Sequence, residues 1–137
     1  MLRVKVRTCS LLLVAVCFGG AAPGAKSQAK LSTTDTYMEL VAGPTAPRLI
    51  VMGGHQQTAW RNRAEESLPA FVERAGKRLP LTWHLVTGSA KVEPNRVIFV
   101  YESKEPHLRL YWQWIARARF GPVEHRIRVE NLSAREF

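Results

Sequence analysis

Cysteine and aspartate are the two residue types that this sequence has least of. Only two cysteines occur in 137 residues, Cys9 and Cys17, and both lie near the amino terminus. Asp35 is the single aspartate. If the first residues are removed on export, the remainder has no thiol, which excludes disulfides, thiolate metal sites and a cysteine nucleophile. The folded chain would then be held together by its hydrophobic core alone.

The first 29 residues have the pattern of an export signal. Basic residues extend to Arg7, an apolar run covers residues 11–18, and small residues precede an A-x-A-like cleavage site near Ser27 or Ala29. We therefore expect residues 1–29 to be a signal peptide. We expect the remainder to be exported, to the periplasm or out of the cell.

The apolar run of this signal is too short for a permanent membrane anchor. It falls far below the ~20 residues that span a bilayer, so we expect no stable anchor in the membrane. A lipid anchor on Cys17 is disfavoured because the bulky Val16 precedes it.

Negative charge is also scarce. The formal net charge is +9, and it falls to +6 without the three basic residues of the signal, Arg3, Lys5 and Arg7. A basic surface that also carries tryptophan can bind nucleic acid. Export separates the chain from cellular nucleic acid, however, and the arginines near the carboxyl end alternate with glutamates. We expect no nucleic-acid partner.

Turn-forming residues divide the rest of the chain into short segments. Residues 30–36 are polar and lack periodicity, which is typical of a linker, so we expect the folded domain at residues 37–137. Residues 55–66 have an ambiguous pattern that fits a loop or one short helical turn. Apolar alternation and β-branched residues predict strands at 37–42, 49–52, 81–86 and 96–103. The fold class expected is mainly β, an antiparallel β-sandwich, complete or truncated, with at most one short helix.

The clearest predicted element is a β-hairpin between residues 108 and 131. Strict alternation places its leucines and both of its tryptophans on one face of the first strand, with arginine, tyrosine and glutamine mainly on the other. A helix fits this strand less well, because the period of two is complete. We expect the tryptophans in the core. After a Gly-Pro turn, the return strand places on one face Val123, His125, Ile127 and Val129.

Glu124 and His125 are adjacent in this hairpin, as an acid–base pair would be. Successive side chains of a strand point to opposite faces of the sheet, so these two cannot act on one substrate. We expect instead a surface glutamate paired with an arginine across the strands, and a partly buried histidine that forms a hydrogen bond.

Motifs for catalysis and metal binding are missing. The spacing of metal ligands is not found among the four histidines, His55, His84, His107 and His125, and we expect no metal. No G-x-S-x-G motif occurs, and we expect no catalytic residue and no cofactor in this chain.

The segment around Trp60 has a composition that can bind a sugar. Its indole ring can stack on a pyranose, and Asn62 and His55 can form hydrogen bonds to hydroxyl groups. We take these three residues as candidate carbohydrate contacts. The alternative interpretation is a tryptophan that anchors a loop among solvated charges, beside a tight turn at Gly53 and Gly54.

The hairpin resembles a region of a known enzyme family. The motifs L-x-L-x-W-x-W, A-R, G-P-V-E-H and I-R-V-E-N within residues 108–131 are similar to the amino-terminal β-sandwich of melibiase-type α-galactosidases, a group of glycoside hydrolases. The resemblance extends more loosely back to about Tyr37, so it covers most of the expected mature chain.

This resemblance implies a non-catalytic role. In that family the sandwich precedes a (β/α)8 barrel that supplies two catalytic aspartates, and retaining glycosidases need two carboxyl groups about 5–5.5 Å apart. The present chain has one aspartate and no room for a barrel of ~250 residues, so no catalytic residue is carried over. The motif also ends near Phe137, where further strands would follow, and we expect a truncated sandwich.

Two functions remain open at this point. The first is the amino-terminal sandwich fragment of an exported α-galactosidase-like enzyme, whose partner is the missing catalytic barrel. The alternative is a stand-alone secreted β-protein that binds carbohydrate through exposed aromatics. In either case, uncovered strand edges and apolar surface predict that the chain self-associates when it is expressed alone.

Overall fold

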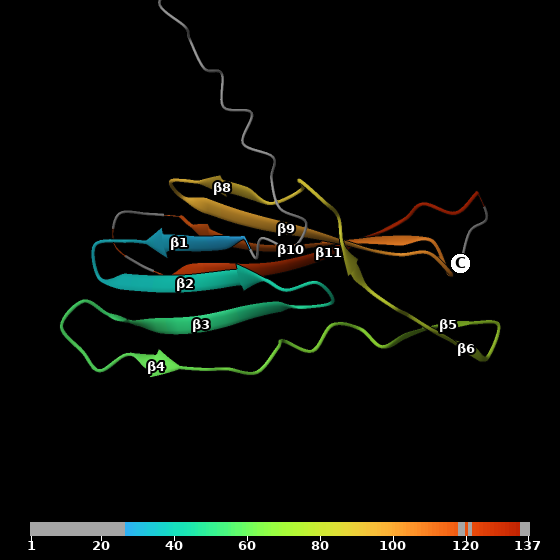
Figure 1. Ribbon diagram of the computed structural model, residues 1–137, viewed down its shortest axis with the longest axis horizontal. Helices are drawn as coiled ribbons and strands as arrows, with labels where there is room; N and C mark the ends of the chain where they lie inside the picture. Colours follow the sequence, from blue (N-terminus) through green and yellow to red (C-terminus); the bar gives the residue numbers. More distant parts are fainter. Residues whose placement is uncertain (1–26, 118–119, 121, 135–137) are drawn as a thin grey trace, which may run out of the picture.

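The structure, a computed structural model, describes residues 27–117, 120 and 122–134 (Figure 1). Residues 1–26, which hold most of the expected signal peptide, lie outside the described residues. The last two residues of the expected signal, Gln28 and Ala29, are described and begin strand β1, where Ala29 packs into the core. A signal that ended at residue 29 would remove them, so the expected boundary does not fit the fold. Within the described part all regular secondary structure is β-strand, and the strands pair antiparallel. The expected mainly β, antiparallel fold is confirmed.

Four strands form the first sheet in chain order: β1 (Gln28–Ser32), β2 (Thr36–Ala42), β3 (Pro47–Gly54) and β4 (Trp60–Arg61). The strands predicted at 37–42 and 49–52 lie within β2 and β3. The linker prediction is wrong for residues 30–32, which belong to β1. Ala29 and Leu31 alternate there with polar residues and pack into the core. Two buried side chains on an edge strand give too weak a periodic signal to read from sequence.

The second sheet is built on the predicted hairpin, and its main path runs β11-β10-β9-β7. Its strands are β7 (His84–Leu85), β8 (Lys91–Glu93), β9 (Arg96–Ser103), β10 (Leu108–Ala116) and β11 (Val123–Asn131), and β8 also pairs with β9. The strand predicted at 81–86 is therefore shorter than expected. A separate hairpin, β5 (Phe71–Arg74) with β6 (Lys77–Pro80), lies at one end of the molecule (Figure 1) and has no counterpart among the predicted strands.

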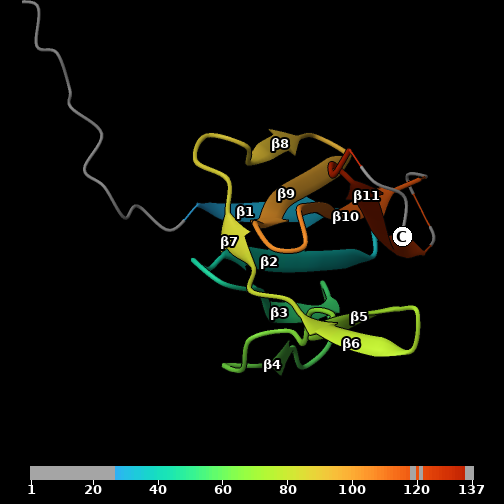
Figure 2. The same cartoon turned by 90° about the vertical axis from the view of Figure 1, so that its right-hand side faces the viewer.

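The two sheets share one hydrophobic core, with β1 beside β9 and β10 (Figure 2). The indole of Trp112 is fully buried and stacks on the ring of Phe99, with centroids 5.5 Å apart. Across the core, the hydroxyl of Tyr101 donates a hydrogen bond to the carbonyl of Gly43 at 3.1 Å. Burial raises the pKa of Tyr101 well above its usual value, so the hydroxyl keeps the proton it donates.

The loop between β4 and β5 connects the two sheets by hydrogen bonds of Glu66. The backbone N–H of Glu66 donates to the carbonyl of Pro47 in the first sheet at 2.9 Å. The carboxylate of Glu66 accepts from the Nε1 of Trp112 in the second sheet at 3.3 Å. Further along, Trp83 donates from Nε1 to the carbonyl of Pro69 at 2.7 Å. This loop therefore holds a carboxylate against the aromatic core.

Candidate functional site

The three residues predicted to contact a carbohydrate do not line one cavity. Asn62 lines a cavity of about 360 Å³ on the first sheet, and His55 lines a separate one of about 250 Å³ beside the turn before β2. Trp60 pairs with Met52 across β3 and β4, and both side chains are substantially exposed. The fold therefore does not bring these three residues together in a single sugar site.

His55, which follows β3, contacts the turn between β1 and β2. Its Nε2 lies 3.0 Å from the carbonyl oxygen of Thr33, and its backbone N–H donates to the carbonyl of Asp35 at 3.3 Å. Its ring also lies 5.6 Å from that of Tyr37, measured between centroids. These contacts give His55 a structural role at the β1–β2 turn.

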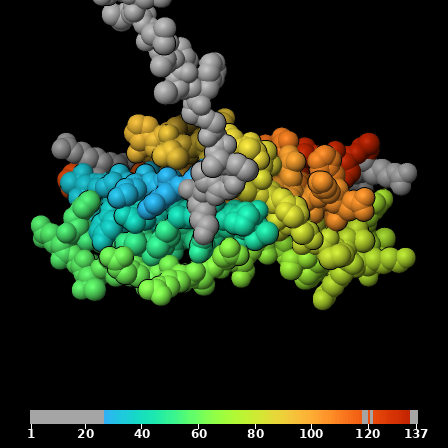
Figure 3. Space-filling view, viewed as in Figure 1, coloured from blue at the N-terminus to red at the C-terminus, as the bar shows by residue number. Residues whose placement is uncertain are grey.

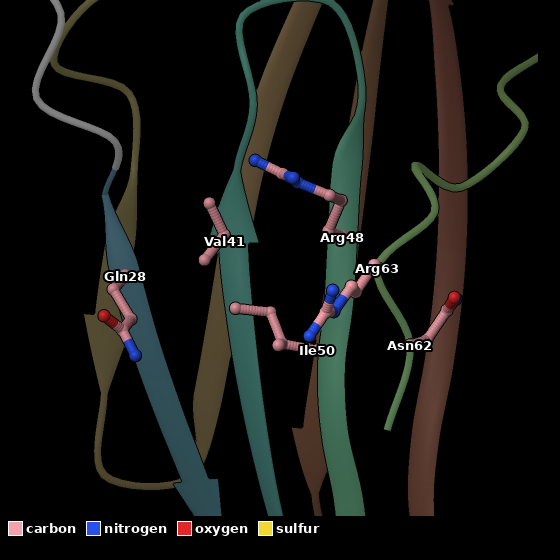
Figure 4. A pocket seen from close by; sticks show the side chains of 6 residues that line it. All are labelled: Gln28, Val41, Arg48, Ile50, Asn62 and Arg63. Carbon is pink, nitrogen blue, oxygen red and sulfur yellow. The ribbon is translucent and has the colours of Figure 1, made fainter. Parts of the chain in front are cut away.

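Asn62 belongs to a cavity on the outward face of the first sheet, which we call the Arg48 cavity. Figure 4 shows the six side chains that line it: Gln28, Val41, Arg48, Ile50, Asn62 and Arg63. The backbone N–H of Asn62 donates to the carbonyl of Ile50 at 2.9 Å, which fixes the segment after β4 against β3. Sequence inspection identifies Asn62 but not its neighbours, because they come from four separate segments.

An aromatic cluster lies on the core-facing side of the hairpin. We define it as Trp112, Trp114 and His125. The ring of His125 stacks on Trp114, with centroids 4.4 Å apart and planes 9° apart, and it meets the edge of Trp112 at 5.2 Å. The expectation of a partly buried, hydrogen-bonded histidine is wrong: His125 is exposed as a residue, and its ring is held by contacts with the two indoles. The tryptophans pack against the core as expected.

Glu66 is a member of this region that sequence inspection misses. Its carboxylate is hydrogen bonded to the indole of Trp112, 46 positions further along the chain. It also influences His125. Desolvation of the imidazole beside the packed indoles lowers the pKa of His125 below its usual value, and the nearby negative charge of Glu66 opposes that shift to a smaller extent. The neutral imidazole is therefore the form that this cluster favours.

Glu124 lies on the opposite face of the hairpin from His125, as predicted. Its carboxylate accepts hydrogen bonds from the guanidinium groups of Arg117 and Arg126. These two hydrogen bonds lower the pKa of Glu124 to about 2. The expected pairing of this glutamate with arginine is confirmed. A carboxylate held ionised in this way is not a general acid at neutral pH.

β11 exposes apolar side chains on the face that points toward the core. Ile127 and Val129 lie directly across from Trp112 and Leu110, which are fully buried. Cross-strand neighbours share one face of a sheet, yet Ile127 is 48% and Val129 47% exposed. We call His125, Ile127 and Val129 the inner strip of β11. β1 contacts β9 and β10, whereas Ile127 and Val129 on β11 keep about half of their surface exposed in the described structure.

Several of the described carboxylates form ion pairs. Within the described chain, arginine or lysine pairs with the side chains of Glu39, Glu93, Glu102, Glu124 and Glu130. No group of three or more His, Cys, Asp or Glu side chains placed to hold a metal ion is found among the described residues. The same residues contain no helix long and apolar enough to cross a membrane.

Comparison with known proteins adds no relative to this description. No family model, curated protein or solved structure matches the chain.

Proposed function

We propose that this chain is a non-catalytic β-sandwich module of an exported α-galactosidase-like glycoside hydrolase, and that it packs against the catalytic (β/α)8 barrel through the inner strip of β11. The motifs that carry the resemblance to that family lie on β10 and β11, the strands that form this surface. The chain would act by positioning and stabilising the barrel.

The inner strip is the observation that carries this proposal. Ile127 and Val129 continue the face of the buried Trp112 and Leu110, but they remain about half exposed. Full burial of a side chain of this size stabilises a protein by about 1.5–3 kcal/mol. Two such side chains that remain half exposed contribute only part of this stabilisation. A second domain that covers the strip would recover it.

The state of the carboxylates is consistent with a module that does no glycoside chemistry. A retaining glycosidase needs one carboxylate as nucleophile and one carboxylic acid of raised pKa. Glu124 and Glu93 instead have lowered pKa values, because each accepts hydrogen bonds from arginine. The carboxylate of Glu66 accepts a hydrogen bond from the indole of Trp112.

The alternative function, a stand-alone protein that binds sugar through exposed aromatics, has less support. Trp60 is 50% exposed and can stack on a pyranose. However, the imidazole of His55 already contacts the carbonyl of Thr33 at the β1–β2 turn, and Asn62 lines a cavity that Trp60 does not line.

Two measurements test the proposed function. The full chain, assayed alone on 4-nitrophenyl α-galactoside, should release no nitrophenol above the rate without protein. The same genome should encode a barrel with paired catalytic aspartates, and co-expression with this chain should raise the soluble yield and thermal stability of that barrel. Hydrolysis by the chain alone would refute the non-catalytic role. A genome without such a barrel, or a barrel unaffected by the chain, would refute the partner.

A further inference from the structure

The Arg48 cavity is built from a row of residues that crosses three strands. Gln28 of β1 pairs with Val41 of β2, and Val41 pairs with Arg48 of β3. Paired residues share one face of a sheet, so these three side chains project together from the outward face. Strands β1 to β4 form one continuous side of the molecule (Figure 3). The cavity thus has a rigid base of hydrogen-bonded backbone.

Four of the six side chains that line the cavity can donate hydrogen bonds, and two of these four are positively charged. Arg48 and Arg63 supply guanidinium groups, and Gln28 and Asn62 supply amides. None of the six lining residues is acidic. On the next row of the same face, Glu39 is paired with Lys30 at 3.2 Å. Neither Arg48 nor Arg63 is among the described arginines that form ion pairs. The cavity therefore carries positive charge that no described carboxylate pairs with directly.

Arg48 also carries a buried donor without a protein acceptor. Its Nε is shielded from solvent and has no hydrogen-bond partner among the described residues. A buried donor left unpaired costs roughly 1–3 kcal/mol, and most buried polar groups in folded proteins are paired. The guanidinium of Arg48 is therefore incompletely paired within the described protein.

We propose that the Arg48 cavity binds a carboxylate-bearing sugar, such as a hexuronic acid. A guanidinium group can hold a carboxylate by two parallel hydrogen bonds. The amides of Gln28 and Asn62 can bond to ring hydroxyls, and the aliphatic side chains of Val41 and Ile50 provide an apolar surface for the C–H face of the ring (Figure 4). This site lies on the first sheet and does not depend on the inner strip of β11 or on the proposed barrel.

Titration of the full chain with galacturonate, galactose and acetate, followed by isothermal calorimetry, tests this proposal. Galacturonate should bind with a dissociation constant near or below about 1 mM. Galactose, which lacks the carboxylate, and acetate, which lacks the ring hydroxyls, should each bind at least tenfold more weakly. Added salt should weaken galacturonate binding, because the attraction is between charges.

Three variants locate the site. Arg48→Ala should weaken galacturonate binding by about tenfold or more, as expected for loss of a hydrogen bond to a charged group. Asn62→Ala should weaken it less. Arg61→Ala is the matched control, because it removes the same charge one position from Asn62 at an exposed residue that does not line the cavity.

Each outcome of this experiment decides the proposal. Equal affinity for galacturonate and galactose would overturn the role of the carboxylate, and equal affinity for galacturonate and acetate would overturn the sugar assignment. Loss of binding in Arg61→Ala equal to that in Arg48→Ala would show a diffuse charge effect in place of a site. No binding by the folded wild-type chain at several times 1 mM would also refute the proposal. If Arg48→Ala fails to fold, Arg63→Ala takes its place.

Discussion

The rings of Trp114 and His125 lie face to face across β10 and β11, with centroids 4.4 Å apart and planes 9° from parallel. This stack joins β10 to the inner strip of β11, to which His125 belongs. At the neighbouring positions Trp112 of β10 is fully buried, whereas Ile127 and Val129 of β11 are about half exposed.

The stack predicts a pH dependence of stability. Desolvation of the imidazole against the indole of Trp114 lowers the pKa of His125 in the folded state, so folding favours the neutral ring. This stabilisation is present above the unfolded pKa of about 6.5 and is lost as the pH falls through the folded pKa. Urea unfolding between about pH 8 and pH 5 should therefore show a smaller fall in the free energy of unfolding for His125→Phe than for the wild type. Identical slopes in the two proteins would contradict this assignment.

Glu66 should stabilise the fold through its hydrogen bond to Trp112. Glu66→Ala leaves the buried Nε1 of Trp112 without its acceptor and should lower the free energy of unfolding by about 1–3 kcal/mol. Glu66→Gln keeps an acceptor and should cost less. Because the negative charge of Glu66 raises the pKa of His125, both variants should lower that pKa further, measured by NMR titration. An unchanged histidine pKa in both would show that the two groups do not interact.

Leu110 of the core and Val129 of the inner strip form a cross-strand pair. Leu110 is fully buried, whereas Val129 is 47% exposed. Leu110→Ala should lower the free energy of unfolding by about 2–5 kcal/mol. Val129→Ala should lower it by less than about 1.5 kcal/mol, because much of its surface is already in water. If guanidinium unfolding showed the same loss of unfolding free energy for both variants, β11 would be covered in solution.

The β5–β6 turn should be stabilised by a single substitution. Arg74 pairs with Lys77, which leaves a two-residue turn in which Ala75 has φ of 48° and Gly76 of 73°. Positive φ at both positions is typical of a type I′ turn, which prefers asparagine at the first. Ala75→Asn should raise the free energy of unfolding by about 1 kcal/mol, since alanine is strained there. Ala75→Val, strained as much or more, is the contrasting control and should not stabilise the protein.

Sequence patterns predicted the elements with complete periodicity. β9, which was predicted from its β-branched and aromatic residues, has the bounds expected. β10 and β11 form the predicted hairpin, because one face of each strand is marked by a period of two. The opposite facing of Glu124 and His125 follows from the same alternation. The β5–β6 hairpin gave no such signal, because its turn is Ala75-Gly76 where Asn-Gly would be recognised.

Features that depend on distant residues could not be predicted in this way. The bond between Glu66 and Trp112 joins positions far apart in the chain. The Arg48 cavity needs the register of three strands, which no local pattern contains. Alternation gave the face on which Ile127 and Val129 lie, but whether another layer covers that face is a tertiary property.

The most direct test of the account is the affinity of the full chain for the barrel encoded in the same genome, measured by sedimentation velocity. The wild type should form a one-to-one complex, and Ile127→Glu should weaken it by at least tenfold, because it places a charge in the inner strip. Gln113→Glu adds the same charge on the opposite face of the sheet, across from Arg126, and should bind like the wild type. Equal affinity of Ile127→Glu and the wild type, or no complex at all, would contradict the claim that the inner strip of β11 is the docking surface.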